Sequence, residues 1–137
     1  MSDELRSFNQ QVIDEFRANK GVVGGPMAGM PLLLLGTRGA RSGEPRTNPL
    51  AYLEADGDLV IIASFAGGEK HPPWYHNLLA DPQVTVEVGE ETYTATATDV
   101  AEPERTELYR KVEAAMPVFT EYQSKTDRVI PVIRLRR

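Results

Sequence analysis

The chain has 137 residues, a formal net charge of −5, 41% hydrophobic residues and no cysteine. This length suits a single domain with one sizeable core, and the acidic balance argues against a nucleic-acid binder, which needs many cations to neutralise phosphates. The lack of cysteine excludes disulfides, thiolate catalysis and cysteine-ligated metal, and two histidines leave little for any other metal site.

The N-terminal part of the chain predicts a helix followed by a flexible connector. Apolar residues recur at helical spacing between residues 3 and 20, at Leu5, Phe8, Val12, Ile13 and Phe16. The connector, "KGVVGGPMAGMP" at residues 20–31, contains four glycines and two prolines, a composition that neither helices nor strands tolerate well. We therefore expect residues 1–30 to form a helix and a flexible segment in front of the main fold.

The chain start also bears on location. "MSDELRSFNQ" lacks the basic and apolar regions of a secretory signal, and no apolar run reaches the about 18 residues that would span a bilayer. We expect a cytoplasmic protein. A second interpretation stays open, in which the apolar stripe of the first helix rests on a membrane surface. The mixed charge of its polar face favours packing instead, because anionic lipid prefers a basic face.

Strand and helix patterns alternate through the rest of the chain. The Asp56-Gly57 dipeptide is typical of a two-residue hairpin turn. We expect strands at residues 32–36, 47–54, 59–65, 83–88, 92–100 and 129–136, and helices at 72–82 and 102–117. These elements predict one α+β domain, residues 1–137, with a six-stranded antiparallel sheet. Closure into a small barrel would remove its exposed edges.

An arginine-rich loop follows the first strand, in "GTRGARSGEPRTNPL" at residues 36–50. Its arginines are either solvated surface charges or parts of an anion site. Three features favour an anion site. Gly43 permits positive φ, and the Ser42 hydroxyl can donate a hydrogen bond. Arg41 and Arg46 have planar guanidinium groups that match phosphate or carboxylate. The spacing fits neither a P-loop nor a dinucleotide-binding glycine motif.

A second cluster, "SFAGGEKHPPWYHN" at residues 64–77, repeats the combination of glycines and a cation. Trp74 and Tyr75 have two interpretations, core packing or the wall of a pocket. His71 and His76 lack the spacing of paired metal ligands on a helix, so a metal site is not expected. A Ser-His-Asp triad cannot be asserted from these residues.

Together these stretches resemble the deazaflavin (coenzyme F-420)-dependent nitroreductase and quinone reductase family. The likeness runs from about Pro31 to Leu135, and its most specific part is G-x-x-S-G-x-P-R-x-N-P-L followed by K-x-P-x-W-Y-x-N. The resemblance implies a split β-barrel that binds reduced F-420 and passes its hydride to a quinone, nitro or activated-alkene acceptor. In such an enzyme the coenzyme supplies the chemistry, while the protein binds, orients and excludes water.

The resemblance also implies cofactor-binding residues. At the anionic phosphate and oligoglutamate end it implies Arg41, Ser42, Gly43, Arg46 and Lys70. The residues implied along the path to the ring are Asn48, Pro49 and Leu50. The residues implied to bring backbone amides to the polar edge of the ring are Ala63, Ser64, Gly67 and Gly68. The residues implied to shape the pocket are Trp74, Tyr75 and Asn77.

Tyr122 and Ser64 are the implied catalytic residues, Tyr122 as proton donor or substrate anchor and Ser64 as a group that polarises the acceptor. Tyr122 is alternatively a packing residue. Ala51, Phe119 and Lys125 stand where we associate aromatic residues with the family, which favours quinones over bulky nitroimidazoles. Two other functions stay open: an FMN-dependent oxidoreductase on the same barrel, and a non-catalytic coenzyme carrier. The expected partners are a small-molecule acceptor and, as an open alternative, a second copy in a homodimer.

Overall fold

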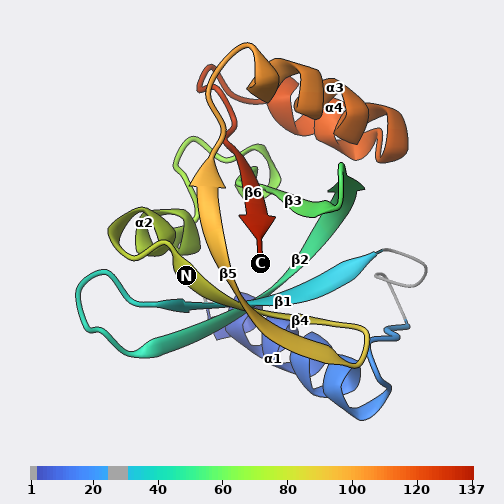
Figure 1. Ribbon diagram of the computed structural model, residues 1–137, viewed down its shortest axis with the longest axis vertical. Coiled ribbons are helices and arrows are strands. Elements are labelled where there is room, and N and C mark those ends of the chain that lie inside the picture. Colours follow the sequence, from blue (N-terminus) through green and yellow to red (C-terminus); the bar gives the residue numbers. More distant parts are fainter. Residues whose placement is uncertain (1–2, 25–30) are drawn as a thin grey trace.

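The computed structural model describes residues 3–24 and 31–137, so residues 25–30 of the predicted connector lie outside the described part. Six antiparallel strands form a closed barrel in the order β1-β2-β3-β6-β5-β4, with helices around it (Figure 1). The elements are α1 (Asp3–Ala18), β1 (Leu32–Arg38), β2 (Pro45–Ala55), β3 (Asp58–Ile62), the single turn η2 (Phe65–Gly67), α2 (Pro73–Ala80), β4 (Gln83–Val88), β5 (Glu91–Asp99), α3 (Glu104–Ala115), α4 (Val118–Ser124) and β6 (Val132–Arg136). The predicted α+β class and six-stranded barrel are confirmed.

The four consecutive leucines of β1 are all buried because both faces of the strand are covered. Leu33 and Leu35 point into the barrel core, while Leu32 and Leu34 pack against α1. On the helix side, the predicted stripe supplies Val12, Ile13 and Phe16 to this second cluster. The described part of the stripe therefore packs on the barrel, and Phe8 at its start stays 40% exposed.

A third apolar cluster fills the space between the strands β3 and β6 and the helices α3 and α4. It includes Val60 and Val132 from the strands and Leu108, Val112 and Phe119 from the helices. Figure 1 shows α3 and α4 together on one side of the barrel and α1 on the opposite side. The barrel is thus covered on these two sides, and α2 also packs on it through Trp74, Tyr75 and Leu78.

Two boundaries differ from the sequence-based expectation. The predicted strand 59–65 ends at Ile62, because Phe65, Ala66 and Gly67 adopt left-handed backbone with φ of 47°, 54° and 78°. Beyond Pro117, where the sequence predicted a helix end, the chain forms the additional helix α4. The predicted Asp56-Gly57 hairpin turn is confirmed, with φ of 54° and 84° at its two residues. None of the described helices has the length and apolar character needed to cross a bilayer.

Candidate functional site

The loop between β1 and β2 is an ordered hairpin, which we call the arginine hairpin (residues 38–46). The amide of Gly39 donates to the Glu44 carbonyl and the amide of Gly43 donates to the Gly39 carbonyl, both at 2.8 Å. These amides are therefore engaged inside the hairpin. The exposed donors that remain are the guanidinium groups of Arg41 and Arg46 and the amides of Arg41 and Ser42, which have no acceptor among the described residues. Arg46 meets Glu44 at 3.5 Å across an exposed surface, a pair that contributes little to stability.

Asn77 of α2 fixes the arginine hairpin in place. Its side-chain Oδ1 accepts a hydrogen bond from the Ala40 amide at 2.9 Å, and its Nδ2 donates to Thr37 Oγ1 at 3.2 Å. Asn77 and Thr37 are both buried, so neither polar group is left without a partner. Asn77 thus has a structural role, which is to hold the arginine hairpin against α2, in addition to the role near the coenzyme that the sequence predicts.

The strand β2 leads from the arginine hairpin toward the middle of the barrel wall. Residues 47–53 of β2 are all half-exposed, although β2 is hydrogen-bonded to β1 and β3 on its two sides. In a barrel strand alternate residues normally point into a filled interior, so this run marks incompletely covered surface on both faces. The expected path residues Asn48, Pro49 and Leu50 lie within it.

The turn η2 begins beside the same stretch of β2. Tyr52 pairs with Ile61, and β2 and β3 are antiparallel, so Ser64 and η2 leave β3 in the direction of Leu50. The amides of Ala63, Gly67 and Gly68 donate to carbonyl groups of the protein, at 2.9–3.0 Å. Of the four amides expected at the coenzyme, only that of Ser64 has no acceptor among the described residues.

Tyr122 lies against η2. A Cβ placed on Gly67 would stand 2.8 Å from the Tyr122 carbonyl oxygen and 3.1 Å from Lys125 Cβ, so α4 packs directly on the turn. The Tyr122 ring is half-buried, meets Phe119 edge-on with centroids 5.4 Å apart, and has the Lys125 ammonium 6.0 Å from its centroid. Part of the Tyr122 ring is therefore packed against its neighbours, as the packing interpretation expects, and the rest of the side chain stays exposed.

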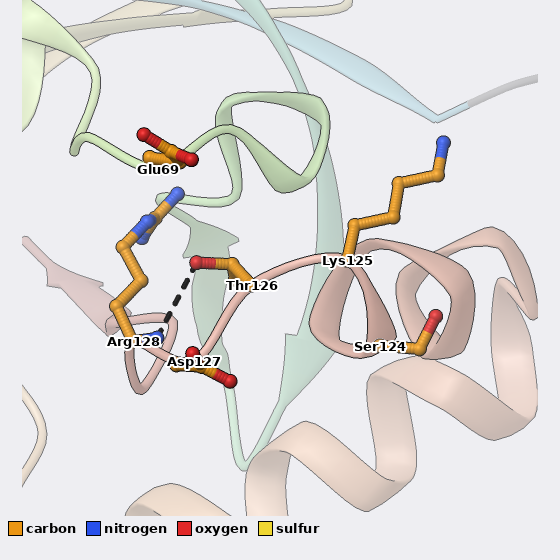
Figure 2. A pocket seen from close by; sticks show the side chains of 6 residues that line it. All are labelled: Glu69, Ser124, Lys125, Thr126, Asp127 and Arg128. Atoms are coloured by element: carbon orange, nitrogen blue, oxygen red, sulfur yellow. Dashed lines mark hydrogen bonds between the residues drawn. The ribbon is translucent and has the colours of Figure 1, made fainter.

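A cavity of about 290 Å³ adjoins this region, lined by Glu69, Ser124, Lys125, Thr126, Asp127 and Arg128. Figure 2 shows the Lys125 side chain pointing away from Glu69 and Arg128, which lie together at the other end. The backbone amide of Arg128 donates to Thr126 Oγ1 at 3.3 Å, which shapes the wall between them. The cavity is thus lined by the end of α4, the segment that follows it and Glu69, and neither Tyr122 nor η2 is among the lining residues.

Trp74 and Tyr75 are core residues of the barrel, 4% and 8% exposed. The Tyr75 hydroxyl donates to Asp99 Oδ2 at 2.5 Å, and burial together with this carboxylate raises the pKa of Tyr75 to about 12. Lys70 is exposed, and no hydrogen bond or ion pair within the described residues joins it to the arginine hairpin. Arg41, Ser42, Gly43 and Arg46 thus lie together in the arginine hairpin, whereas Lys70 belongs to the segment between η2 and α2.

Arg128 is a residue that sequence reasoning missed. Its guanidinium donates to the carbonyl oxygens of Ala63, Ser64 and Gly68 at 3.1, 2.6 and 2.9 Å. These acceptors are backbone groups, which leave no signal in a sequence. Within the described residues no three histidine, aspartate or glutamate side chains are grouped as metal ligands.

The resulting arrangement is one surface with two chemically different ends. The arginine hairpin offers cations to an anionic group, and at the other end lie half-buried Tyr122 of α4 and Ser64, which precedes η2 and is only 8% exposed. The half-exposed run of β2 joins these ends. Such a surface suits an elongated ligand with an anionic tail and a flat, mostly apolar head.

Comparison with known proteins gives consistent matches. The family model for F420H(2)-dependent quinone reductases matches residues 8–136. An F420H(2)-dependent quinone reductase of Mycobacterium tuberculosis is 40% identical over 127 residues, covering 89% of this chain and 85% of that protein. Among solved structures, an F420-H2 dependent reductase (FDR-A) is 39% identical, with a TM-score of 0.71, covering 77% of this chain and 94% of that one. Another, described as a domain-swapped dimer, is 36% identical, with a TM-score of 0.73 and 98% coverage of both chains.

Proposed function

The chain belongs to the F420H(2)-dependent quinone reductase family, and we propose that it transfers a hydride from reduced F420 to a quinone. The proposal is carried by the surface that links the arginine hairpin to η2 and α4 along β2. Its two ends match a coenzyme that has an anionic tail and a planar ring. The comparisons favour F420 over FMN and an enzyme over a non-catalytic carrier.

The arginine hairpin fits the anionic end of the coenzyme. Arg41 and Arg46 are exposed and can each give two parallel N–H bonds to a phosphate or carboxylate. The Ser42 hydroxyl accepts from the Glu44 amide at 3.2 Å and keeps its own hydrogen for donation. We assign these side chains, together with Lys70, to the phosphate and oligoglutamate groups.

The head of the coenzyme would lie along β2. Pro49 and Leu50 offer apolar surface and Asn48 a polar group, while η2 brings backbone close to the ring. When bound, the coenzyme supplies the two-electron hydride chemistry. The protein must orient the ring and keep water from it, and the half-buried residues of β2 are suited to both tasks.

Tyr122 and Ser64 are proposed to act on the acceptor. Reduction of a quinone by a hydride leaves a negative charge on one oxygen, which then needs a proton. The Tyr122 hydroxyl has no hydrogen-bond partner among the described residues, so it is free to donate to that oxygen. The Ser64 hydroxyl is a second donor toward the acceptor. Trp74 and Tyr75 act indirectly, because they are part of the core beneath the site.

We also propose that quinones are preferred to nitroimidazoles. Ala51 is small, Phe119 is buried and lacks a hydroxyl, and Lys125 places a flexible cation beside Tyr122. This combination offers few aromatic surfaces on which a bulky nitroheterocycle could stack. Turnover measured with menadione and with a nitroimidazole, at equal concentrations of reduced F420, tests the preference.

Coenzyme titration tests the function directly. We expect F420 fluorescence to be quenched at low micromolar protein concentration, with no response of FMN, and reduced F420 to be oxidised on addition of menadione. Arg46→Ala should weaken F420 binding by about 1.5–3 kcal/mol, the scale of a hydrogen bond to a charged group. Arg110→Ala, an exposed arginine of α3, is the control. If FMN binds and F420 does not, the proposal is wrong.

Two further proposals concern assembly and location. The relative described as a domain-swapped dimer supports a homodimer for this chain as well, which light scattering coupled to size-exclusion chromatography would detect. Because α1 packs Val12, Ile13 and Phe16 on β1, we propose that it does not attach to membranes and that the enzyme acts in the cytoplasm. Co-sedimentation with anionic vesicles would contradict the second proposal.

A further inference from the structure

Arg128 lies between α4 and β6 and reaches back to the segment that contains η2. Its Nη2 donates to the Ser64 carbonyl at 2.6 Å, its Nη1 to the Ala63 carbonyl at 3.1 Å, and its Nε to the Gly68 carbonyl at 2.9 Å. These carbonyl groups stand on both sides of η2. One guanidinium therefore holds the two ends of the turn at a fixed separation.

The turn needs such support because its backbone is unfavourable. Phe65 and Ala66 are non-glycine residues in the left-handed region, which is unfavourable relative to ordinary backbone. A conformation of this kind persists only when surrounding contacts determine it. Gly67 packs against α4 on one side, and the bonds from Arg128 fix the flanking carbonyl groups.

A fourth contact of Arg128 involves His71. Arg128 Nη1 lies 3.0 Å from His71 Nδ1, and an arginine can only donate, so Nδ1 must be the unprotonated nitrogen and the hydrogen of the neutral ring is on Nε2. Burial, then the charge of Arg128 and then His76 lower the pKa of His71, against a smaller opposing effect of Asp99. The neutral ring is thus the form that the structure requires.

We propose that Arg128 is a positioning residue for Ser64 and that neutral His71 is part of the same device, so that protonation of His71 displaces Arg128 and loosens η2. The importance of Ser64 for turnover rests on the proposed function, whereas the contacts among Arg128, His71 and η2 do not. Protonated His71 would place a second cation 3.0 Å from the guanidinium and remove the acceptor at Nδ1.

The direction of the pH effect follows from the lowered pKa of His71. The stability that the neutral His71 ring gives to this arrangement is fully present above the ordinary histidine pKa of 6.5. It is lost as the pH falls through the lower pKa that His71 has in the folded protein. The titratable groups that face His71 are the rings of Tyr75 and His76 on α2, with Asp99 behind Tyr75. Glu69 and Asp127 line the cavity on the Arg128 side.

Nitrogen-15 NMR of the coenzyme-free protein tests the geometry without any assay of turnover. We expect His71 to show an unprotonated Nδ1, a hydrogen on Nε2 and a pKa below 6.5. In Arg128→Met, which removes the charge and keeps a similar length, the pKa of His71 should rise. Should Arg128→Met not fold, Arg128→Lys serves instead, since one ammonium cannot bond all four acceptors. A hydrogen on Nδ1, or a pKa of His71 that no Arg128 variant changes, would overturn the inference.

The pH profile of menadione reduction tests the consequence. Wild-type turnover should fall below about pH 6.5, and His71→Asn, whose Oδ1 can replace Nδ1 as acceptor, should abolish that fall. His76→Asn is the matched control: the fall should remain and move only to a somewhat higher pH, because His76 helps to lower the pKa of His71. Arg128→Lys should lower kcat about ten- to hundred-fold, because small displacements of a reacting group have effects of that size. If wild type reduces menadione but His71→Asn has the same profile, the inference fails and the proposed function stands. If no quinone is reduced while the NMR results hold, the proposed function fails alone.

Discussion

The contact between η2 and α4 can be tested at Gly67. Gly67 has φ of +78°, and a Cβ at this position would stand 2.8 Å from the Tyr122 carbonyl oxygen and 3.1 Å from Tyr122 Cα and Lys125 Cβ. Two of these atoms belong to the backbone of α4 and cannot turn away as the end of a side chain can. Gly67→Ala must therefore push α4 off the turn or force the turn into another conformation.

The expected destabilisation has two parts. Left-handed backbone costs alanine about 1–2 kcal/mol, and inserting a methyl group into a packed contact costs about 1–3 kcal/mol. Gly57 in the β2–β3 turn allows the backbone cost to be measured without the packing cost. Its φ is +84°, and apart from its chain neighbours no described atom lies within 4 Å of where a methyl group would stand. We expect Gly57→Ala to lose about 1–2 kcal/mol and Gly67→Ala to lose about 2–5 kcal/mol.

Urea unfolding of both variants gives the free energies, and menadione turnover gives the functional effect. Gly67→Ala should lower turnover because Tyr122 moves with α4, whereas Gly57→Ala should not, since its turn is remote from the site. Equal destabilisation of the two variants would mean that α4 does not pack on η2 as described. Normal turnover in a clearly destabilised Gly67→Ala protein would separate Tyr122 from catalysis.

Three more variants test other parts of the structure. Asn77→Ala removes the acceptor of the Ala40 amide, so the free energy of unfolding measured in urea should fall by about 1–3 kcal/mol and F420 binding should weaken. Unchanged F420 affinity would show that the arginine hairpin holds its shape without α2. Hydrogen bonds from Arg136 and then Arg134 lower the pKa of Asp58. The stability that Asp58 contributes is therefore present above the ordinary pKa of 3.8 and is lost as the pH falls below it. Asp58→Asn should make the free energy of unfolding less dependent on pH in this acid range, and an unchanged dependence would contradict the assignment. Tyr122→Phe should lower kcat by about tenfold or more with F420 affinity within twofold, whereas equal losses in both would indicate a packing role.

The barrel was predictable because its strands carry local signals. Alternating apolar residues and the Asp56-Gly57 turn depend on neighbours in sequence, and they identified all six strands. α4 was missed because it is short, follows Pro117 and is held by a contact with Gly67 that is distant in the sequence. The early end of β3 was missed for a similar reason, since the apolar pattern of 59–65 continues through backbone that turns left-handed.

The candidate site was predicted less completely than the fold. The arginine hairpin was expected as an exposed cationic loop, and the structure has it so, but its glycine amides bond within the loop. Trp74 and Tyr75 had two interpretations from sequence; both side chains are buried in the barrel core, and their part in shaping a pocket stays a prediction. Arg128 gave no signal, because a sequence does not reveal which carbonyl groups a distant guanidinium will reach.

The segment from His71 to Asn77 connects the two ends of the proposed site. At one end Asn77 holds the Ala40 amide of the arginine hairpin, and at the other His71 meets Arg128, which holds η2. Between them the Tyr75 hydroxyl bonds Asp99 at the end of β5, so the connecting segment is itself fastened to the barrel. A coenzyme bound at its tail by the hairpin would therefore present its ring at a set distance from Ser64. A fixed position of the ring favours hydride transfer to an acceptor held beside it, because the rate depends steeply on the separation of the reacting atoms.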